Sequence, residues 1–311
     1  MIREVMEFLS PEPDGVYVDA TLGLGGYAEA ILEITEGAAR VIGIDVDEDS
    51  LKYAESRLEG YAPRVEFVRE NFSHIDEILN DLGIGEVDGI VADVGMSSYQ
   101  IESSGRGFSF LREEPLDMRF DTRLDTSAKD IVNTYTFDEL STLIKVNGEE
   151  RWAKKIARDI IKVRSERPIR SSLELAEIVS RAIPKKFHPR DIHPATRTFQ
   201  ALRIAVNNEL QNLKLFISKA APLLKPGGKI AVVSFHSLED RVVKKAFKKL
   251  ASPCTCPPDL PVCVCHKKKM LNILTPAPIT PSMEEAMENR RARSAKLRGG
   301  ERTQNEELQS A

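Results

Sequence analysis

Cysteine is absent from almost the whole sequence. All four, Cys254, Cys256, Cys263 and Cys265, fall within one 12-residue stretch. This distribution excludes a disulfide scaffold, which needs cysteines spread along the chain. No uninterrupted apolar run is long enough to span a bilayer, and the first residues lack the basic-then-apolar layout of a secretion signal. We therefore expect a cytoplasmic protein with no membrane partner.

An overall excess of positive charge is also missing, because the formal net charge is −4. The charge is unevenly distributed: residues 1–150 carry a net −21, residues 151–203 a net +9 and residues 204–311 a net +8. Such segregation can place a basic face on an acidic protein, and basic faces bind phosphate backbones. Charge alone leaves two interpretations open, an RNA-binding surface and ordinary solvated helices.

Short β-rich runs alternate with helical stretches over the first ninety residues. We expect strands at 15–19, 40–45, 64–68 and 87–93, and helices at 28–36, 50–58 and 75–82. The strand cores are nearly continuous in apolar residues, which is typical of a parallel sheet covered on both faces.

This alternation stops in the middle third of the chain, which is polar, basic and helical in pattern. We expect helices at 148–163 and 172–182, then a helix at 202–224 and a strand at 229–235 that resume the α/β pattern. The predicted organisation is an α/β domain formed by residues 1–105 and 205–300, an inserted helical domain at 106–204, and a disordered tail at 301–311.

A glycine-rich turn, Thr21–Gly26, follows the first predicted strand and leads into a helix. Glycines there let the backbone approach a ligand closely. The second strand ends in Asp45, twenty residues after Gly25, where a carboxylate can accept both ribose hydroxyls of an adenosine. Asp93, which ends the fourth strand, offers an anion to an ammonium group or to the N–H of a nucleophile. The alternative role for both aspartates is helix capping.

The identity of the cofactor depends on what the turn lacks. The third glycine of the dinucleotide fingerprint is missing, and no basic residue follows the turn to face a pyrophosphate. These absences favour S-adenosylmethionine over a dinucleotide.

Eight stretches spaced along nearly the whole chain form a specific combination. They are Asp19–Gly26, Gly43–Asp47, Asp93–Gln100, Arg106–Phe110, Pro115–Arg119, His193–Ala201, Ser234–Arg241 and Asn289–Ser294. In these stretches the sequence closely resembles the RsmH/MraW family, the bacterial 16S ribosomal RNA (cytosine N4)-methyltransferases. The resemblance implies a class I, Rossmann-like S-adenosylmethionine-dependent methyltransferase sheet with an inserted helical substrate domain. It also implies 16S ribosomal RNA within the small ribosomal subunit as the partner, and it leaves a homodimer open.

Carried over by position, the resemblance also implies the cofactor contacts. These are Gly25, Gly26, Tyr27, Asp45, Phe72, Asp93 and Gln100. The sequence departs from the family in two places: Tyr27 stands where the family usually has histidine, and the chain begins after a short histidine-containing segment of the family.

Methyl transfer from a sulfonium is an in-line displacement that requires aligned reactants and exclusion of water. Cytosine N4 is a poor nucleophile because its lone pair is delocalised into the ring. We assign Asp93 as the catalytic acceptor for the N4–H, or as a contact to the cofactor beside it. The candidate substrate contacts are Arg106, Arg119, Arg197 and His236. For the arginines, salt bridges with Asp117 or Asp121 are the alternative, and for His236 a packing or hydrogen-bonding role.

The cysteine cluster, together with His266, offers soft ligands for tetrahedral zinc. Its C-x-C spacing is tighter than the usual C-x-x-C, and a reduced surface loop is the alternative, so we assign no metal from the sequence. Two other functions remain open: a non-catalytic RNA-binding factor with a vestigial nucleotide site, and a nicotinamide-dependent dehydrogenase. The first leaves the retention of Gly25, Asp45 and Asp93 together unexplained, and the second lacks its third glycine.

Overall fold

The computed structural model describes the whole chain except residues 190, 255, 257–264, 266–267, 290–291 and 305–311. The chain forms two compact units, residues 1–95 with 210–311, and residues 96–209. The second unit is larger at both ends than the predicted insertion. Met96 packs against its core, and Glu209 is ion-paired with Arg203. None of the helices in the described part of the chain is both long enough and apolar enough to cross a membrane.

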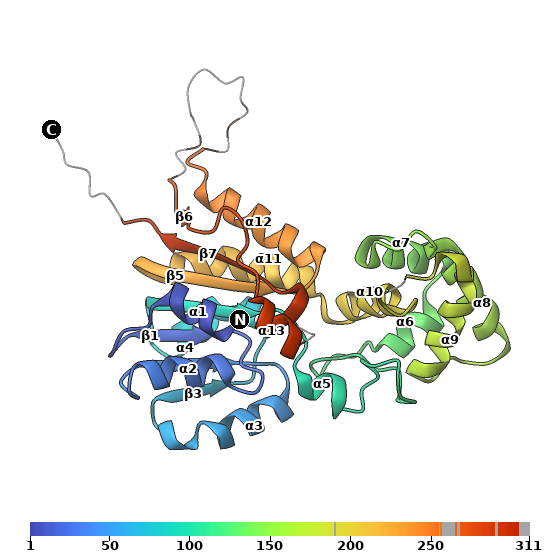
Figure 1. Cartoon of the computed structure of the whole chain (residues 1–311), viewed down its shortest axis with the longest axis horizontal. Helices are drawn as coiled ribbons and strands as arrows, with labels where there is room; N and C mark the ends of the chain where they lie inside the picture. The colour runs from blue at the N-terminus through green and yellow to red at the C-terminus, as the bar shows by residue number, and fades with distance from the viewer. Residues whose placement is uncertain (190, 255, 257–264, 266–267, 290–291, 305–311) are drawn as a thin grey trace. The chain divides into compact units, whose positions relative to one another are not determined.

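The first unit is built on a seven-stranded sheet with the order β3-β2-β1-β4-β5-β7-β6 (Figure 1). The strands are β1 (Val16–Asp19), β2 (Arg40–Ile44), β3 (Val65–Val68), β4 (Val87–Asp93), β5 (Leu224–Ser234), β6 (Leu271–Ile273) and β7 (Lys296–Arg302). Strands β1 to β5 are parallel, whereas β7 is antiparallel to both of its neighbours. The order reverses between β1 and β4, as in the Rossmann-like class I sheet predicted from the sequence.

The two antiparallel strands correct the prediction for the C-terminal region. Glu301 and Arg302 belong to β7, where they pair with Lys229 and Leu271 of the neighbouring strands. The predicted disordered tail therefore began too early, and residues 305–311 lie outside the described residues.

Helices cover both faces of this sheet. They are α1 (Ile2–Leu9), α2 (Gly26–Ile34), α3 (Glu48–Arg57), α4 (Ile75–Asp81), α11 (Glu209–Ala220), α12 (Ser237–Ala251) and α13 (Met283–Glu288), with 3-10 turns η1 (Glu59–Tyr61), η2 (Phe72–His74), η4 (Ala221–Leu223) and η5 (Ala292–Ser294). Successive strand residues belong to different cores: Tyr17 and Val41 to one, Val18 and Ile42 to the other. Burial on both faces explains why the strands are apolar without alternation.

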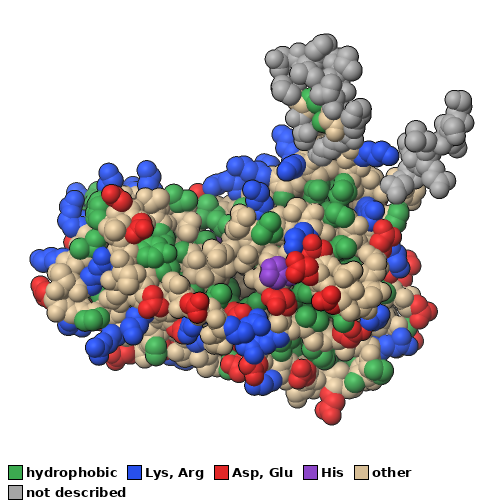
Figure 2. All heavy atoms as spheres, turned by 180° about the vertical axis from the view of Figure 1, so that it is seen from behind, with side chains coloured by type: hydrophobic (Ala, Val, Ile, Leu, Met, Phe, Trp, Pro, Cys, Tyr) green, Lys and Arg blue, Asp and Glu red, His purple; other side chains and the backbone are tan. Residues whose placement is uncertain are grey.

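The second unit is helical, with its own buried core. Its elements are α5 (Ser98–Glu102), α6 (Ala128–Thr134), α7 (Phe137–Gly148), α8 (Ala153–Glu166), α9 (Ser172–Ala182), η3 (Lys185–Phe187) and α10 (Thr196–Asn207). Figure 2 shows Lys and Arg side chains along the edge that this unit forms.

Two predicted helices were wrong in their extent, for a common reason. The helix expected at 148–163 is interrupted at Glu149, and the one expected at 202–224 at Asn208, because both residues adopt left-handed backbone conformations, with φ of 49° and 50°. A single left-handed residue ends a helix but leaves the helical spacing of apolar residues before and after it intact. The sequence therefore predicted one continuous helix where the structure has a break.

Gly107 is required where the chain passes close to Pro115. Its φ is +73°, and a Cβ there would collide with the carbonyl oxygen of Pro115. Gly105 has a similar φ of +63°, but a Cβ there would meet nothing within 4 Å. The two glycines therefore share a left-handed backbone conformation, but an added side chain would collide with a neighbour only at Gly107.

We expect Gly105→Ala to cost about 1–2 kcal/mol of unfolding free energy, the scale for a left-handed L-residue. Gly107→Ala should cost clearly more, because it adds a collision with backbone that cannot rotate away. Urea unfolding of the two variants against the wild type measures the difference. Equal losses would show that Gly107 is needed only for its φ.

Candidate functional site

Three carboxylates gather at the carboxyl edge of the sheet, on both sides of the point where the strand order reverses. Asp19 and Asp93 end the neighbouring strands β1 and β4, and Asp45 directly follows β2. Open α/β sheets bind ligands at such a switch point. Asp19 was part of a motif in the sequence but was not predicted as a site residue. Its place at the end of a strand, like that of Asp93, is the signal that could have identified it.

The glycine-rich turn is held in place by a hydrogen bond to the Asp45 carboxylate. Asp45 Oδ2 accepts from Gly23 N at 2.8 Å, and its Oδ1 accepts from Asp47 N at 2.8 Å. Gly25, the N-cap of α2, has a φ of +81°, which favours glycine. Burial nevertheless raises the pKa of Asp45 to about 6, although these N–H groups oppose the rise.

Tyr27 contacts the predicted catalytic residue directly. Its hydroxyl donates to Asp93 Oδ2 at 2.9 Å, and Asp93 N donates to Thr21 Oγ1 at 2.6 Å. Burial raises the pKa of Tyr27 well above its ordinary value, so its hydroxyl remains a neutral donor. Burial also raises the pKa of Asp93, to about 6, while the Tyr27 hydrogen bond acts to lower it. The tyrosine at position 27 thus supplies a hydrogen bond to Asp93.

Asp19 is the most deeply buried of the three carboxylates. Its Oδ1 accepts from Thr21 N at 3.3 Å, but its buried Oδ2 has no hydrogen-bond partner among the described residues. Burial raises its pKa to about 7, and the charges of Asp93 and Asp45 raise it further. No Lys or Arg of the described chain forms an ion pair with these three residues. The edge therefore favours a ligand that brings positive charge or hydrogen-bond donors.

Phe72 and His236 also follow strands at this edge, and both take part in local structure. Phe72 opens η2 after β3, and its ring packs edge-on against Phe216 with centroids 5.1 Å apart. His236, after β5, caps α12: its Nδ1 accepts from Glu239 N at 3.4 Å, and its Nε2 lies 3.0 Å from Glu239 Oε1.

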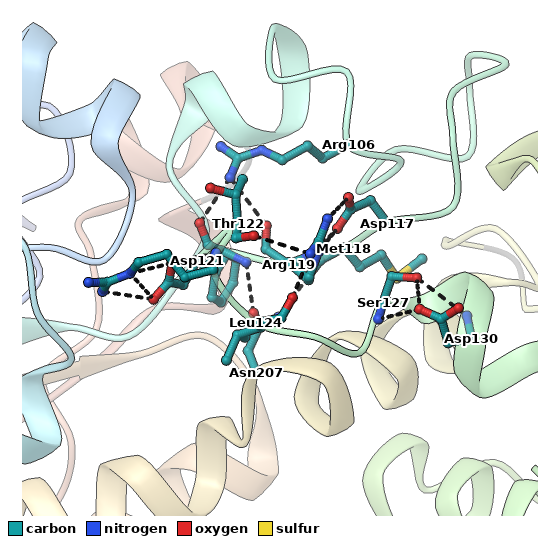
Figure 3. Close-up of polar contacts among 12 residues, drawn as sticks. Arg106, Asp117, Met118, Arg119, Asp121, Thr122, Leu124, Ser127, Asp130 and Asn207 are labelled. Atoms are coloured by element: carbon teal, nitrogen blue, oxygen red, sulfur yellow. Dashed lines mark hydrogen bonds and ion pairs between the residues drawn. The ribbon is translucent and has the colours of Figure 1, made fainter.

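In the second unit, Gln100 and Arg106 each have an intramolecular role. Gln100 Oε1 accepts from Ser97 N at 3.1 Å and completes the capping box of α5. The buried Arg106 guanidinium donates to the carbonyl oxygens of Arg119 and Phe120, at 3.2 and 2.9 Å (Figure 3).

Arg119 shows the salt bridge that the sequence left as an alternative. Its Nε and Nη2 donate to the two carboxylate oxygens of Asp117 at 2.7 and 2.8 Å (Figure 3). Asn207 holds the same loop from α10, donating to Met118 O and accepting from Phe120 N. Among the four candidate substrate contacts, Arg197 is the exposed one, and its hydrogen bond to Glu149 O is long at 3.4 Å.

The raised pKa of Asp19 predicts an unusual pH dependence of stability. A carboxyl that holds its proton more tightly when folded stabilises the fold below its ordinary pKa of about 4, and this contribution is lost as pH rises to about 7. Asp19→Asn cannot ionise. The stability of the ligand-free variant relative to wild type should therefore improve by a few kcal/mol between about pH 5 and pH 8, since one pKa unit corresponds to about 1.4 kcal/mol.

Chemical unfolding at the two pH values measures this double difference. Asp81→Asn, which changes an exposed side chain of the same unit, is the control. A difference between Asp19→Asn and wild type that stays constant with pH would contradict the burial argument.

The chain is similar to known methyltransferases over nearly its whole length. The model of the MraW methylase family matches residues 1–303. The protein named ribosomal RNA small subunit methyltransferase H from Geobacter sulfurreducens is 50% identical over 302 residues, covering 97% of each chain. Its namesakes from Trichlorobacter lovleyi and Clostridioides difficile are 49% and 47% identical over 97% of this chain and 96% and 97% of theirs. A solved rRNA methylase from Streptococcus thermophilus aligns with a TM-score of 0.44 at 10% identity, covering 97% of this chain and 96% of that one, a likeness too weak to bear on the site.

Proposed function

Because the chain belongs to the MraW methylase family, we propose that it transfers a methyl group from S-adenosylmethionine to N4 of a cytidine in 16S ribosomal RNA. We place this reaction in the cytoplasm, on the RNA of the small ribosomal subunit. The names of the relatives, which specify small-subunit ribosomal RNA, support the substrate class. The single observation that carries the proposal is the group of three carboxylates beside the glycine-rich turn.

The residues at this edge fit S-adenosylmethionine. The ligand brings an ammonium group, two ribose hydroxyls and a sulfonium, and when bound it supplies an electrophilic methyl group. Asp45 is suited to accept from the ribose hydroxyls, because it already fixes the turn through Gly23. Asp19, with an oxygen that has no partner in the described chain, is suited to the ammonium. A dinucleotide would instead bring a pyrophosphate into a region where no Lys or Arg of the described residues forms an ion pair with the carboxylates.

Asp93 is the residue that we assign to the chemistry. Its carboxylate would accept the N4–H of cytosine as the carbon–nitrogen bond forms. Tyr27 holds one carboxylate oxygen in place, and the backbone of Asp93 is held by Thr21. With a pKa of about 6, Asp93 is ionised at neutral pH and is close to the proton affinity that favours general-base catalysis.

Labelled methyl transfer tests the proposal. Full-length protein with tritiated S-adenosylmethionine should label 16S RNA or small-subunit particles, and nucleoside analysis should identify N4-methylcytidine. Calorimetry should show binding of S-adenosylmethionine and no binding of NAD. RNA that stays unlabelled in both forms would overturn the proposal and favour a non-catalytic RNA-binding factor.

Asp93→Asn should lower methyl transfer by about 10²- to 10⁴-fold, the range for loss of general-base help. In the wild type, kcat/KM should rise with pH through about 6 as Asp93 ionises, and this limb should be missing from the variant. Tyr27→Phe is the matched comparison: losing its hydrogen bond should raise the pKa of Asp93 and move the limb to higher pH. Full activity in a folded Asp93→Asn protein would remove the carboxylate from the mechanism.

The RNA-binding surface that we propose lies on α8 of the second unit. Lys154, Lys155, Arg158 and Lys162 recur at helical spacing, and all but the half-buried Lys155 are exposed. In the described chain none of them forms an ion pair with Glu149, Glu150 or Asp159, so their charge is available to solvent. The carboxylate of Glu150 instead accepts from Trp152 N at the start of α8.

An aromatic side chain accompanies this charge. Phe187, 40% exposed, has Lys186 Nζ 5.0 Å and the Arg151 guanidinium 5.8 Å from its ring centroid. Cations around an exposed ring are suited to a nucleic acid, which presents phosphates and base faces together.

Neutralising Lys154, Lys155, Arg158 and Lys162 together should weaken RNA binding and make the dependence of log affinity on log salt shallower by about 0.7 per lost contact. Affinity for S-adenosylmethionine should not change. The control removes the same charge from α12, at Lys244, Lys245, Lys248 and Lys249, and should keep the parental slope. A parental slope in the α8 variant would contradict the assignment of this surface.

A further inference from the structure

The loop between α12 and β6 brings three cysteines together. The Sγ atoms of Cys254, Cys256 and Cys265 all lie within 4.8 Å of one another, and all three residues are thiols. We propose that these three thiolates bind a zinc ion. The proposal does not depend on the methylation chemistry.

The distances suit tetrahedral zinc. A tetrahedron with Zn–S bonds of about 2.3 Å has edges of about 3.8 Å, and the Sγ atoms of Cys254 and Cys265 are 3.7 Å apart. Cys256 N donates to Cys254 Sγ at 3.3 Å, and N–H groups that bond ligand atoms orient and stabilise them as metal ligands. Zinc binding would replace the three thiol protons, which pass to solvent.

A C-x-C pair alone would chelate zinc tightly and with strain, but the ligands proposed here are not confined to one such pair. Cys254 and Cys265 come from the two ends of the segment, so the ion would be chelated across the loop and not by one close pair alone. Cys263 and His266, which the sequence also offers as ligands, lie outside the described residues, and the fourth position is not assigned.

A backbone hydrogen bond closes the base of the loop, where Met270 N donates to Leu250 O at 3.0 Å. At the start of the loop, Ser252 Oγ donates to Cys254 O at 2.6 Å. A metal at the cysteines would close the segment above this base, where no helix or strand is described. Zinc with thiolate ligands commonly acts in this structural way.

Topology separates this loop from the carboxylates. Helix α12 leaves the carboxyl end of β5 and returns along the sheet, and β6 runs parallel to β5 because each is antiparallel to β7. The loop therefore lies at the amino edge of the parallel strands, opposite Asp19, Asp45 and Asp93. This placement predicts that zinc supports the loop and takes no part in binding S-adenosylmethionine.

Elemental analysis of full-length protein purified without chelator tests the proposal. The wild type should hold about one zinc per chain. Cys254→Ser, Cys256→Ser and Cys265→Ser should each lose most of it, and Lys268→Ser, which changes an exposed side chain of the same loop, should keep it. Replacement with Co²⁺ should give thiolate-to-metal charge-transfer absorption that the three cysteine variants lack. If a serine variant fails to fold, titration of the native wild-type protein with a chelator replaces it, because zinc release should expose thiols to a thiol reagent.

Three outcomes would overturn the proposal. The first is wild-type protein without zinc that takes up neither Zn²⁺ nor Co²⁺ when reduced. The second is thiol reactivity that is equal with and without chelator. The third is thiols that become reactive only after a reductant, which would identify a disulfide. Unchanged calorimetric affinity for S-adenosylmethionine after zinc removal is the expected result, and a loss would contradict the separation of the two sites.

Discussion

Like charges crowded at one edge of a sheet cost free energy unless hydrogen bonds or a ligand offset the repulsion. Asp19, Asp45 and Asp93 create this situation, and burial adds to it by penalising the ionised form of each. Much of the surrounding structure offsets that cost. The backbone N–H groups of Gly23 and Asp47 donate to Asp45, the Tyr27 hydroxyl donates to Asp93, and one oxygen of Asp19 has no partner in the described chain. The edge is organised for a cationic, donor-rich ligand before any ligand binds.

The parallel strands could be predicted because their signal is local. Burial on both faces makes each strand a continuous apolar run, and glycines mark the turns. Strand β7 has no such signal: its sequence contains Arg298, Gly299 and Gly300. The glycines suit a strand here because the Phe8 ring occupies the place of a side chain at Gly299, and the buried Arg298 pairs with Asp240 at 2.6 Å. Both partners are distant in sequence, so no pattern within the segment could reveal the strand.

The candidate site shows the same limit. Asp45 and Asp93 could be found from their positions at strand ends, whereas the role of Tyr27 depends on a hydrogen bond from α2 to the end of β4, 66 residues further along the chain. Arg106 and Arg119 looked like phosphate contacts because arginine is suited to phosphate. Their donors instead meet carbonyl oxygens and a carboxylate of a loop whose path depends on Asn207, nearly ninety residues further along the chain. A guanidinium on a charged loop has the same sequence signature whether it faces a ligand or its own backbone.

The position of β7 between β5 and β6 has a consequence for how the chain is made on the ribosome. The second unit is continuous in sequence, so all of it has emerged once residue 209 has left the exit tunnel. The sheet is formed by the segments before and after this unit. Its strand β7 is synthesised after both of its neighbours, β5 and β6, and must enter between them. Domains generally fold as units during synthesis, N-terminal parts first. Here the interrupting unit can fold while its host still has an open sheet edge, and the sheet of the methylase is complete only after β7 has been synthesised.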